Sequence, residues 1–533
     1  MTTVKEILAA RAGTTGDEAA RIEKAYEFAR AAHEGHTRFS GEPYFIHPAA
    51  VAKVLAQYGM DATTIVAGLL HDTVEDGLAS AEDIETEFGS EVRFLVEGVT
   101  KLGTHKYRGA ERHAESLRRL LVATAADIRV LIVKLADRYH NMQTLAHVPE
   151  AKRHRIALET VEIYAPIADR LGMGRMKRDL EDLAFPFIDA DAYTHTLEVR
   201  KLKTKESEVG LAKVQKDLRR ELAKKGLRNF RTEIRIKGLW SLHQKLMRKG
   251  EDISQIHDIA ALRIIVGQTE DCYTALGVVH ALHKPLPGEF KDYIAFTKPN
   301  GYQSLHTTVV TAEAGVVEIQ IRTDQMHRDA QFGIASHMSY KQLGTASKGR
   351  FASLSLSWMR SLIPSLLRMK SKSLDEARDS LATAQSAPSW LTELADAHTE
   401  VAGSREFVEE LKEDFFSYRV FVFTPKGDVV DLPSGATPID FAYAIHSDLG
   451  DHLQGAKVNS KLVTFDTELH NGDIVEIVRR ESARPSPKWL PVVKTSLARR
   501  HIRAKLGLTE PDKPTPTRTP QMRRHARKTM HHP

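Results

Sequence analysis

The segment IVAGLLHDTVEDG (65–77) joins an apolar run to a group of side chains that bind metal ions and water. Its first six residues are typical of a buried helix, and His71 and Asp72 follow at the end of that run. Glu75 and Asp76 come directly afterwards, where carboxylates can orient a water molecule. His-Asp is also a common dipeptide and helix ends are often polar, so this segment alone leaves both interpretations open.

Two other segments carry ligand-type side chains on predicted helices. His47 precedes Pro48, a residue that suits the first position of a helix, so His47 is expected at a helix N-terminus. Asp137, Asn141 and Thr144 are spaced i, i+4 and i+7. Side chains with this spacing share one face of a helix.

The three segments together predict a metal site on an all-α background. Two imidazoles and two carboxylates suit a divalent transition ion such as Mn²⁺, Fe²⁺ or Zn²⁺. The charge of such an ion lowers the pKa of bound water and yields a hydroxide nucleophile near neutral pH. The four candidate ligands are His47, His71, Asp72 and Asp137.

The 533 residues are too many for one ordinary domain and suggest roughly three or four. Helical periodicity runs over 19–193, and a long charged helix is predicted over 197–226. Alternation of apolar and polar residues then predicts strands at 231–238, 261–267 and 316–323, with helices between them. The middle of the chain is therefore expected to be α/β.

Composition divides the rest of the chain. Residues 347–405 are rich in Ser, Ala and Lys and are expected to form a helical linker, whereas short strands return over 418–478. Prolines among basic residues predict an unstructured end over 511–533. The expected domains are 1–195, 196–345, a helical linker 346–415, 416–480, and a final region 481–533.

The formal net charge of +6 comes from 76 basic and 70 acidic residues, and residues 511–533 carry six basic side chains against one acidic. The body is therefore nearly balanced, and the tail is either a solvated end or a contact for nucleic acid or the ribosome. The single cysteine, Cys272, excludes an internal disulfide and a cysteine-based zinc site. Without an apolar stretch of ~18 residues or a signal-peptide pattern, we expect a cytoplasmic protein with no membrane partner.

The strand predicted at 316–323 carries a second candidate site. Its apolar and polar residues alternate, and Glu318 lies on the polar face. Asp258 precedes the strand that contains Arg263, and two carboxylates on adjacent strands suit a Mg²⁺-dependent nucleotide transfer. The alternative is an amphipathic strand with a solvated charged face. Further candidates for contacts with phosphates or a base are Arg235, Lys237, Lys245 and Tyr302.

The segments around the first site resemble the hydrolase domain of RelA/SpoT homologues, which belong to the HD phosphohydrolase superfamily and act in (p)ppGpp metabolism. The matching segments are RFSGEPYFIHP (38–48), HDTVEDG (71–77) and KLADRYHNMQTL (134–145). The resemblance implies that the four ligands hold Mn²⁺ and that Glu75 and Asp76 activate water. Phe39 departs from the family, because many members have a polar or basic residue there. The implied nucleotide contacts are Arg38, Asn141 and Thr144.

The second site resembles the synthetase domain of the same family, whose members transfer pyrophosphate from ATP to the 3′-hydroxyl of GDP or GTP. The matching segments are HDIAALRI (257–264), DCYTALGVVH (271–280), FKDYIAFTKPNGYQSLHTTV (290–309) and EIQIRTDQMH (318–327). By this match Asp258 holds Mg²⁺, Glu318 is a Mg²⁺ ligand or the general base, and Tyr302 stacks on guanine. The residues matched to the acceptor's phosphates are His306, Lys298 and Asn300. Those matched to the surroundings of ATP are Arg235, Lys237, Ser241, Lys245 and Arg263.

The segment Glu289-Phe290-Lys291-Asp292 mixes two patterns of this family. Bifunctional members typically carry Arg-x-Lys-Asp at this place, and synthetase-only members carry Glu-x-Asp-Asp. The acceptor preference, GDP or GTP, and the metal dependence therefore stay open.

The segment VFVFTPKGDVVDLPSGATPIDFAYAIHSDLG (420–450) resembles a TGS domain, a β-grasp module. In the long RelA/SpoT enzymes this module reads the 3′ end of tRNA on the ribosome, and His446 matches the tRNA contact. The family pattern continues to about residue 506, and the zinc-finger and ACT domains of long members are expected to be missing.

The resemblance leads us to expect a three-domain enzyme of the stringent response. Its parts would be an all-α HD-type hydrolase domain, an α/β nucleotidyltransferase-like synthetase domain and a β-grasp TGS domain. Opposed conformational states of the two enzymatic domains would avoid a futile cycle. A single-activity hydrolase or synthetase, and a non-enzymatic ribosome- or tRNA-binding regulator, stay open as alternatives, and so does the oligomeric state.

Overall fold

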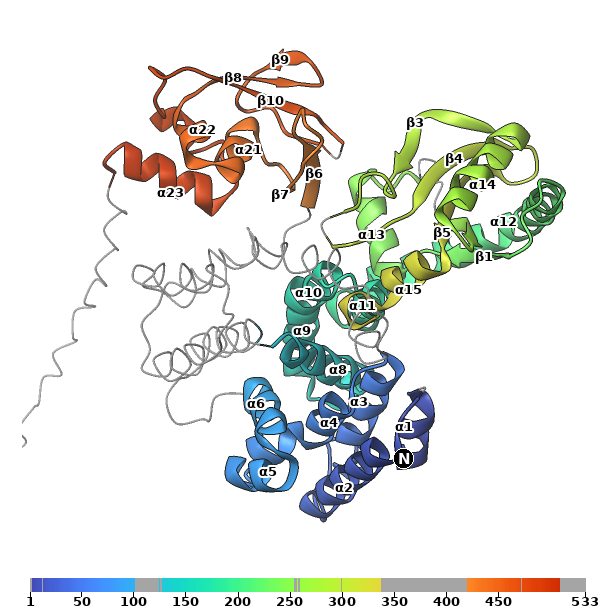
Figure 1. Ribbon diagram of the computed structural model, residues 1–533, viewed down its shortest axis with the longest axis vertical. Helices are drawn as coiled ribbons and strands as arrows, with labels where there is room; N and C mark the ends of the chain where they lie inside the picture. The colour runs from blue at the N-terminus through green and yellow to red at the C-terminus, as the bar shows by residue number, and fades with distance from the viewer. Residues whose placement is uncertain are drawn as a thin grey trace, which may run out of the picture.

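The computed structural model describes residues 2–11, 13–100, 124, 127–253, 256, 259–298, 300–336, 419–470 and 472–508. Figure 1 shows an N-terminal group of helices, a central sheet with its helices, and a C-terminal module of short strands and helices. Within the described ranges, no helix is long and apolar enough to cross a membrane. The expected linker 346–415 and the tail 511–533 lie outside these ranges.

The described secondary structure of the N-terminal part consists of helices, as the periodicity predicted, apart from one isolated bridge between Thr37 and Pro43. Capping boxes fix the first helix starts, because Thr3 and Thr15 each exchange hydrogen bonds with a glutamate three residues later. The helices are α1 (Val4–Ala10), α2 (Gly16–Ala32), α3 (Ile46–Gln57), α4 (Ala62–Glu75), α5 (Ala81–Phe88), α6 (Ser90–Val99), α8 (Arg129–Gln143), η1 (Leu145–His147), α9 (Glu150–Glu159), η2 (Thr160–Tyr164), α10 (Ala165–Arg170) and α11 (Gly174–Ile188).

The core of the helical part brings α3, α4 and α8 together. Ile65, Leu69 and Leu70 of α4 are fully buried in it. Gly68 lets α3 approach α4 closely, since a Cβ at this position would lie 2.4 Å from Cδ1 of Leu55. This packing sets the helix ends that carry the predicted metal ligands beside one another.

The central part is a five-stranded sheet with the strand order β1-β2-β5-β4-β3. β2 and β5 run parallel, and the other neighbouring pairs are antiparallel. α12 and α14 cover one face and bury the apolar residues of β2, β4 and β5. The strands are β1 (Phe230–Ile236), β2 (Ala260–Val266), β3 (Lys284–Asp292), β4 (Leu305–Thr311) and β5 (Gly315–Thr323). The helices are α12 (Ala190–Lys224), α13 (Leu239–Arg248), α14 (Thr269–Leu282) and α15 (Asp324–Phe332).

The strands predicted at 231–238, 261–267 and 316–323 are confirmed as β1, β2 and β5. The long helix predicted over 197–226 is also confirmed as α12. It begins earlier than predicted because the side chain of Asp189 accepts a hydrogen bond from the backbone N–H of Ala192 and caps its N-terminus.

Two strands differ in burial from a simple amphipathic pattern. β1 lies at the edge of the sheet, and its apolar residues Ile234 and Ile236 are 40% and 43% exposed. On β5 the polar residues Gln320 and Arg322 are as buried as the apolar ones. At these two positions β5 therefore does not present a solvated charged face to water.

The C-terminal module has a two-stranded sheet, β6 with β7, and a three-stranded sheet in the order β10-β8-β9. A bridge between Phe423 and Ile474 joins them. The short strands predicted over 418–478 are present in this module, among them β6 and β10. The elements are β6 (Arg419–Phe423), β7 (Val429–Pro433), α21 (Pro438–Ile445), α22 (Ser447–Asp451), β8 (Leu453–Val458), β9 (Lys461–Val463), β10 (Val475–Arg479), η6 (Pro487–Trp489) and α23 (Ser496–Lys505).

Asp440 is a fully buried carboxylate that ties this module together. It accepts hydrogen bonds from the backbone N–H and hydroxyl of Thr437, which caps α21. It also accepts from the backbone N–H groups of Lys494 and Thr495 and from the Thr495 hydroxyl. A buried charge needs such partners, so the start of α23 is held against α21.

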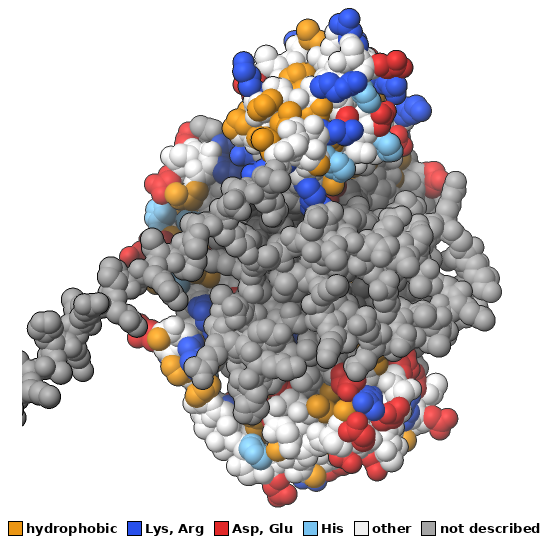
Figure 2. Space-filling model, turned by 90° about the vertical axis from the view of Figure 1, so that its left-hand side faces the viewer, with side chains coloured by type: hydrophobic (Ala, Val, Ile, Leu, Met, Phe, Trp, Pro, Cys, Tyr) orange, Lys and Arg blue, Asp and Glu red, His pale blue; other side chains and the backbone are white. Residues whose placement is uncertain are grey.

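Charged side chains are unevenly distributed over the described surface, although the formal net charge of the chain is small. Figure 2 shows acidic side chains gathered on the N-terminal helices at the bottom of the view. Exposed acids of α5 and α6, among them Glu82, Glu87 and Glu91, belong to this end of the molecule.

Candidate active sites

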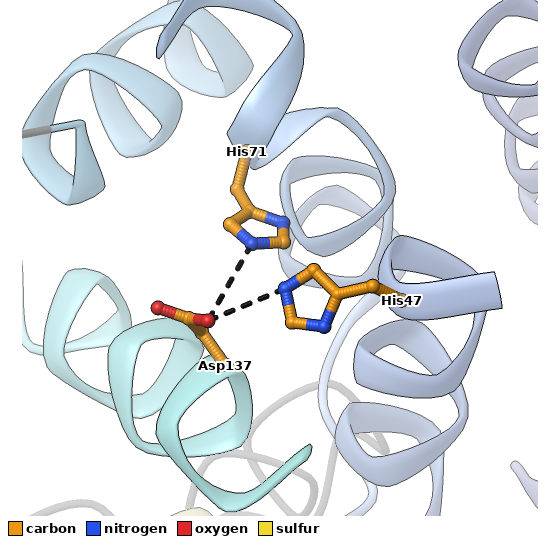
Figure 3. Close-up of side chains that lie close together, drawn as sticks. All are labelled: His47, His71 and Asp137. Atoms are coloured by element: carbon orange, nitrogen blue, oxygen red, sulfur yellow. Dashed lines mark ion pairs between the residues drawn. The ribbon is translucent and has the colours of Figure 1, made fainter. Parts of the chain in front are cut away.

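Four side chains from three helices meet in the helical part. His47 lies in the first turn of α3, and Asp137 projects from α8. His71 and Asp72 lie one turn before the end of α4. Figure 3 shows both imidazole rings and the carboxylate of Asp137 pointing toward one another.

The distances define a common point between these side chains. Nε2 of His47 lies 3.3 Å from Oδ1 of Asp137 and 3.4 Å from Oδ2 of Asp72. Nε2 of His71 lies 3.2 Å from Oδ1 of Asp72 and 3.9 Å from Oδ1 of Asp137. Ligand atoms of His47, His71 and Asp137 all fall within 4.8 Å of one another. The structure thus brings together the four residues that the sequence put forward as ligands.

The surroundings of His71 fit a metal ion. Its Nδ1 lies 2.9 Å from the carbonyl oxygen of Gly68 and donates to it, so Nε2 carries the lone pair. That Nε2 is buried and has no hydrogen-bond partner among the described residues. A buried polar atom without a partner costs free energy, and a divalent ion satisfies it. Two imidazoles and two carboxylates are a suitable donor set for such an ion.

Nearby charges keep the ligands in the states that bind cations. Burial alone raises the pKa of Asp137, but Nζ of Lys134, 2.9 Å from its Oδ2, and the two imidazoles bring that pKa well below its usual range. Burial lowers the pKa of His47. Near neutral pH the Asp137 carboxylate is therefore charged and the His47 imidazole neutral, as metal binding requires.

Arg38 joins the loop before α3 to α8. Its Nη2 donates to Oδ1 of Asn141 at 3.0 Å and to the hydroxyl of Thr144 at 3.3 Å. Asn141 in turn donates from Nδ2 to Oδ1 of Asp137. The three residues matched to nucleotide contacts therefore lie together, directly beside Asp137, a predicted metal ligand. Phe39, the departure from the family, is 72% exposed.

Glu75 and Asp76 lie one turn beyond the ligands of α4. Partial burial, with the charges of Asp72 and Glu75, raises the pKa of Asp76. A raised pKa makes a carboxylate a better proton acceptor. The hydroxyl of Tyr44 donates to Oδ2 of Asp72 at 3.0 Å and fixes the ligand next to this pair.

In the central part, a row of polar side chains crosses all five strands. Glu233 of β1 is in register with Arg263 of β2, and Arg263 with Gln320 of β5. Gln320 is in register with His306 of β4, which is in register with Lys291 of β3. Residues in register point to the same face of a sheet, so strands far apart in the sequence contribute to one polar surface.

Glu318 lies beside this row and contacts two of its members. Its Oε1 accepts a hydrogen bond from Nε2 of Gln320 at 2.8 Å and lies 3.3 Å from Nδ1 of His306. Nε2 of His306 lies 2.8 Å from the hydroxyl of Tyr302. Burial raises the pKa of Glu318, but His306 and Gln320 lower it to about 2. Glu318 is therefore a half-buried carboxylate that stays charged.

The remaining predicted residues of this site fall into two groups. Arg235 is the second-last residue of β1, and burial together with the charges of Arg322 and Arg235 lowers the pKa of Arg263 to about 10. Several cations thus lie close together around Glu318. Nζ of Lys298 lies 4.5 Å from the ring centre of Tyr293 and 5.4 Å from that of Tyr302.

In the second group, Ser241 and Asn300 contact the N-terminal helical part. Ser241, on α13 with Lys245, donates to Oε2 of Glu181 on α11 at 3.2 Å. Asn300 donates from Nδ2 to the carbonyl oxygen of Asp169 at 3.0 Å. Lys237 lies between β1 and α13, and its carbonyl accepts from Arg200. Asp258 lies outside the described residues.

Comparison with known proteins gives matches in the order of the three parts. The HD domain matches residues 25–174, the region found in RelA/SpoT proteins matches 234–345, and the TGS domain matches 420–479. Residues 234–345 are thus similar to the region found in RelA/SpoT proteins, and 91% of the chain is similar to a protein named SpoT. The expected fold class is therefore confirmed: a helical HD part, an α/β RelA/SpoT part and a β-rich TGS part.

Three curated relatives carry different names. The GTP pyrophosphokinase of Myxococcus xanthus is 43% identical over 486 residues, which cover 90% of this chain and 60% of that protein. The guanosine-3′,5′-bis(diphosphate) 3′-pyrophosphohydrolase of Aquifex aeolicus is also 43% identical, over 91% of this chain and 64% of its own. The bifunctional (p)ppGpp synthase/hydrolase SpoT of Escherichia coli is 41% identical, over 91% of this chain and 65% of that protein. The chain thus spans less than two thirds of the length of these relatives.

Sequence reasoning passed over two residues that contact the predicted ligands. Lys134 pairs with Asp137, and His140 contacts both Arg38 and His47. Both lie in the segment 134–145, and His140 is three residues after Asp137, a spacing that could have placed it on the same helix face.

In the TGS part, His446 is exposed between α21 and α22. Its Nδ1 accepts a hydrogen bond from the backbone N–H of Asp448 at 3.1 Å, which fixes the ring at the start of α22. The opposite edge of the ring is directed away from this contact, so the residue matched to tRNA binding is accessible.

Proposed function

We propose that this chain both degrades and makes (p)ppGpp. It would remove pyrophosphate from the 3′ position of (p)ppGpp and transfer pyrophosphate from ATP to the 3′-hydroxyl of GDP or GTP. One observation carries the proposal: the same chain holds the four converging side chains His47, His71, Asp72 and Asp137 and also the half-buried Glu318 with its partners. The name of the Escherichia coli relative, a bifunctional synthase/hydrolase, supports both activities.

For hydrolysis, the proposed ion is Mn²⁺, whose charge makes water acidic near neutral pH. Glu75 and Asp76 would orient the attacking water and accept its proton, and the raised pKa of Asp76 supports this role. Arg38 would exchange its contacts with Asn141 and Thr144 for the nucleotide, whose phosphates suit a guanidinium.

For synthesis, the proposed ion is Mg²⁺, held by Asp258 and Glu318. The pKa of Glu318, near 2, favours the ligand role over that of general base, because a weakly basic carboxylate takes up a proton poorly. Tyr302 would stack on the guanine, and His306, Lys298 and Asn300 would bind the phosphates of the acceptor. The residues proposed to surround ATP are Arg235, Lys237, Ser241, Lys245 and Arg263.

The TGS part is proposed to contact tRNA on the ribosome through His446. A cytoplasmic location is proposed as well, and the proposed nucleotide substrates support it. By the same proposal, residues 416–480 regulate the two sites. The expected domain limits 1–195 and 196–345 are proposed for the hydrolase and synthetase, since the four converging side chains lie in the first range and Glu318 with its partners in the second.

A paired assay on one preparation tests the proposal. The full chain is incubated with ATP, GDP or GTP and Mg²⁺, and separately with ppGpp and Mn²⁺, and products are separated by ion-exchange chromatography. We expect turnover in both reactions. Turnover in one alone would favour a single-activity enzyme, and turnover in neither by a folded chain that binds tRNA would favour the non-enzymatic regulator.

A further inference from the structure

His140 of α8 lies between Arg38 and the metal ligand His47, and it is buried. Its Nδ1 lies 2.9 Å from Nδ1 of His47 and 3.1 Å from Nη1 of Arg38. One ring nitrogen therefore contacts both the residue proposed to bind the nucleotide and a residue proposed to bind the ion.

The chemistry of the two partners fixes the direction of both hydrogen bonds. Nε2 of His47 faces Asp72 and Asp137, so an ion bound there uses the lone pair of Nε2. Neutral His47 then carries its proton on Nδ1 and donates it. Arg38 has no acceptor atom and also donates. Nδ1 of His140 must accept from both, although a neutral imidazole has a single lone pair at that atom.

We infer that His140 is a positioning residue that holds His47 in its metal-binding tautomer and couples the nucleotide-binding Arg38 to the ion. When Arg38 turns toward a phosphate, the lone pair of His140 becomes fully available to His47, and the His47 ring is held more firmly. Partners of ligating histidines act in this way in many metal sites. The part that involves the nucleotide rests on the proposed function.

Coupling of this kind is reciprocal. If release of Arg38 strengthens the site for the ion, then binding of the ion favours release of Arg38 by the same factor. The enzyme would thus bind its nucleotide best when the ion is present, without any contact between Arg38 and the ion.

The first experiment measures binding of Mn²⁺ alone to the metal-stripped full chain by isothermal titration calorimetry. His140→Leu removes the acceptor, and we expect about 10- to 100-fold weaker binding. His140→Asn places a carbonyl oxygen near the former Nδ1 and should stay within a few-fold of wild type. His147→Leu, at an exposed histidine just beyond α8, is the matched control and should leave the affinity unchanged.

His140→Gln keeps the test decisive if the leucine variant does not fold. Its amide reaches the position of Nε2 rather than Nδ1, so it should lose Mn²⁺ affinity while His140→Asn retains it. Circular dichroism checks the fold of each variant. Equal Mn²⁺ affinity in folded asparagine and glutamine variants, or wild-type affinity in folded His140→Leu, would overturn the inference.

The second experiment tests the coupling by a double-mutant cycle with the same titration. Arg38→Ala removes a positive charge near the ion in any background, but it releases a shared lone pair only when His140 is present. We therefore expect Arg38→Ala to tighten Mn²⁺ binding more in the wild-type chain than in His140→Leu. An equal effect in both backgrounds would overturn the coupling.

These readouts separate the inference from the proposed function. A wild-type chain that binds no Mn²⁺ would contradict the proposed hydrolase site itself. Normal Mn²⁺ binding by wild type and by every His140 variant would contradict the inference alone.

Discussion

The hydroxyl of Tyr302 lies 2.8 Å from Nε2 of His306, whose Nδ1 faces Glu318 at 3.3 Å. Burial lowers the pKa of His306, but Tyr302 and Glu318 together raise it. Burial raises the pKa of Tyr302, but His306 and Arg322 lower it to about 7. The three side chains therefore share their protons, and a ligand that engages one of them changes the charge on the others.

Glu318→Gln should lower pyrophosphate transfer by at least the ~10²-fold that is typical of losing a positioned acid–base or ligand group. Glutamine keeps the size and an acceptor for Gln320 but removes the charge. The fold should remain because the apolar face of β5 is untouched, and hydrolysis should remain because its residues lie on α3, α4 and α8. The rate of transfer from ATP to GDP at saturating Mg²⁺ is the measurement.

The matched control is Glu313→Gln, an exposed acid on the turn before β5 that pairs with Lys213 at 3.0 Å. It should leave transfer unchanged. A folded Glu318→Gln chain with near wild-type transfer would remove Glu318 from the reaction and leave Asp258 as the candidate carboxylate.

Asp72→Ala should abolish ppGpp hydrolysis while synthesis survives. The change removes the carboxylate that lies 3.2 Å from His71 and 3.4 Å from His47, and with it a proposed ligand. Hydrolysis and synthesis are measured on the same preparation, with Glu82→Ala on α5 as a control, since Glu82 is exposed and pairs only at the surface with Arg93. Equal loss of both activities in a folded variant would contradict two separate sites.

Local patterns predicted those parts of the sites that depend on one element. The spacing of Asp137, Asn141 and Thr144 predicted a shared helix face, and the alternation in β5 predicted one polar face with Glu318. The structure has both arrangements, because helix and strand periodicity act over a few residues.

Contacts between distant segments could not be derived from local helix or strand periodicity. Arg38 meets His140 across 102 residues, and Ser241 meets Glu181 across 60, through the packing of whole helices. The exposure of Ile234 likewise depends on β1 being an edge strand, which the alternation within β1 does not encode. The resemblance to a known family identified site residues in these distant segments. The contacts between them could be seen only in the folded structure.

Glu181→Gln should stabilise the protein more at pH 8 than at pH 5. Burial raises the pKa of Glu181 from 4.5 to about 7, and it is 7% exposed. Because the folded pKa lies above the unfolded one, the folded state binds the proton more strongly. The stability linked to this group is therefore present below about pH 4.5 and is lost as pH rises through about 7. Scanning calorimetry at both pH values measures the change in melting temperature.

The expected gain at pH 8 is at most about 3 kcal/mol, since one pKa unit corresponds to about 1.4 kcal/mol. Glutamine still accepts the hydrogen bond from Ser241, so the contact between α11 and α13 is kept. Glu198→Gln, at an exposed position of α12, is the control and should shift the melting temperature equally at both pH values. A pH-independent gain for Glu181→Gln would mean that folding does not raise the pKa of this carboxyl.

Gly333→Ala should destabilise the chain far more than Gly250→Ala, although both glycines have a positive φ, of +56° and +60°. At either position the added methyl group is strained, because a positive φ favours glycine. At Gly333 its carbon would also lie 2.0 Å from the carbonyl oxygen of Leu171, whereas at Gly250 no described atom lies within 4 Å. The clash is with backbone and would push the end of α15 away from the loop before α11, where the N–H of Ile334 donates to Leu171 at 2.9 Å. Melting temperatures of the two variants measure the difference, and equal losses would mean that this close approach of the two segments does not exist in solution.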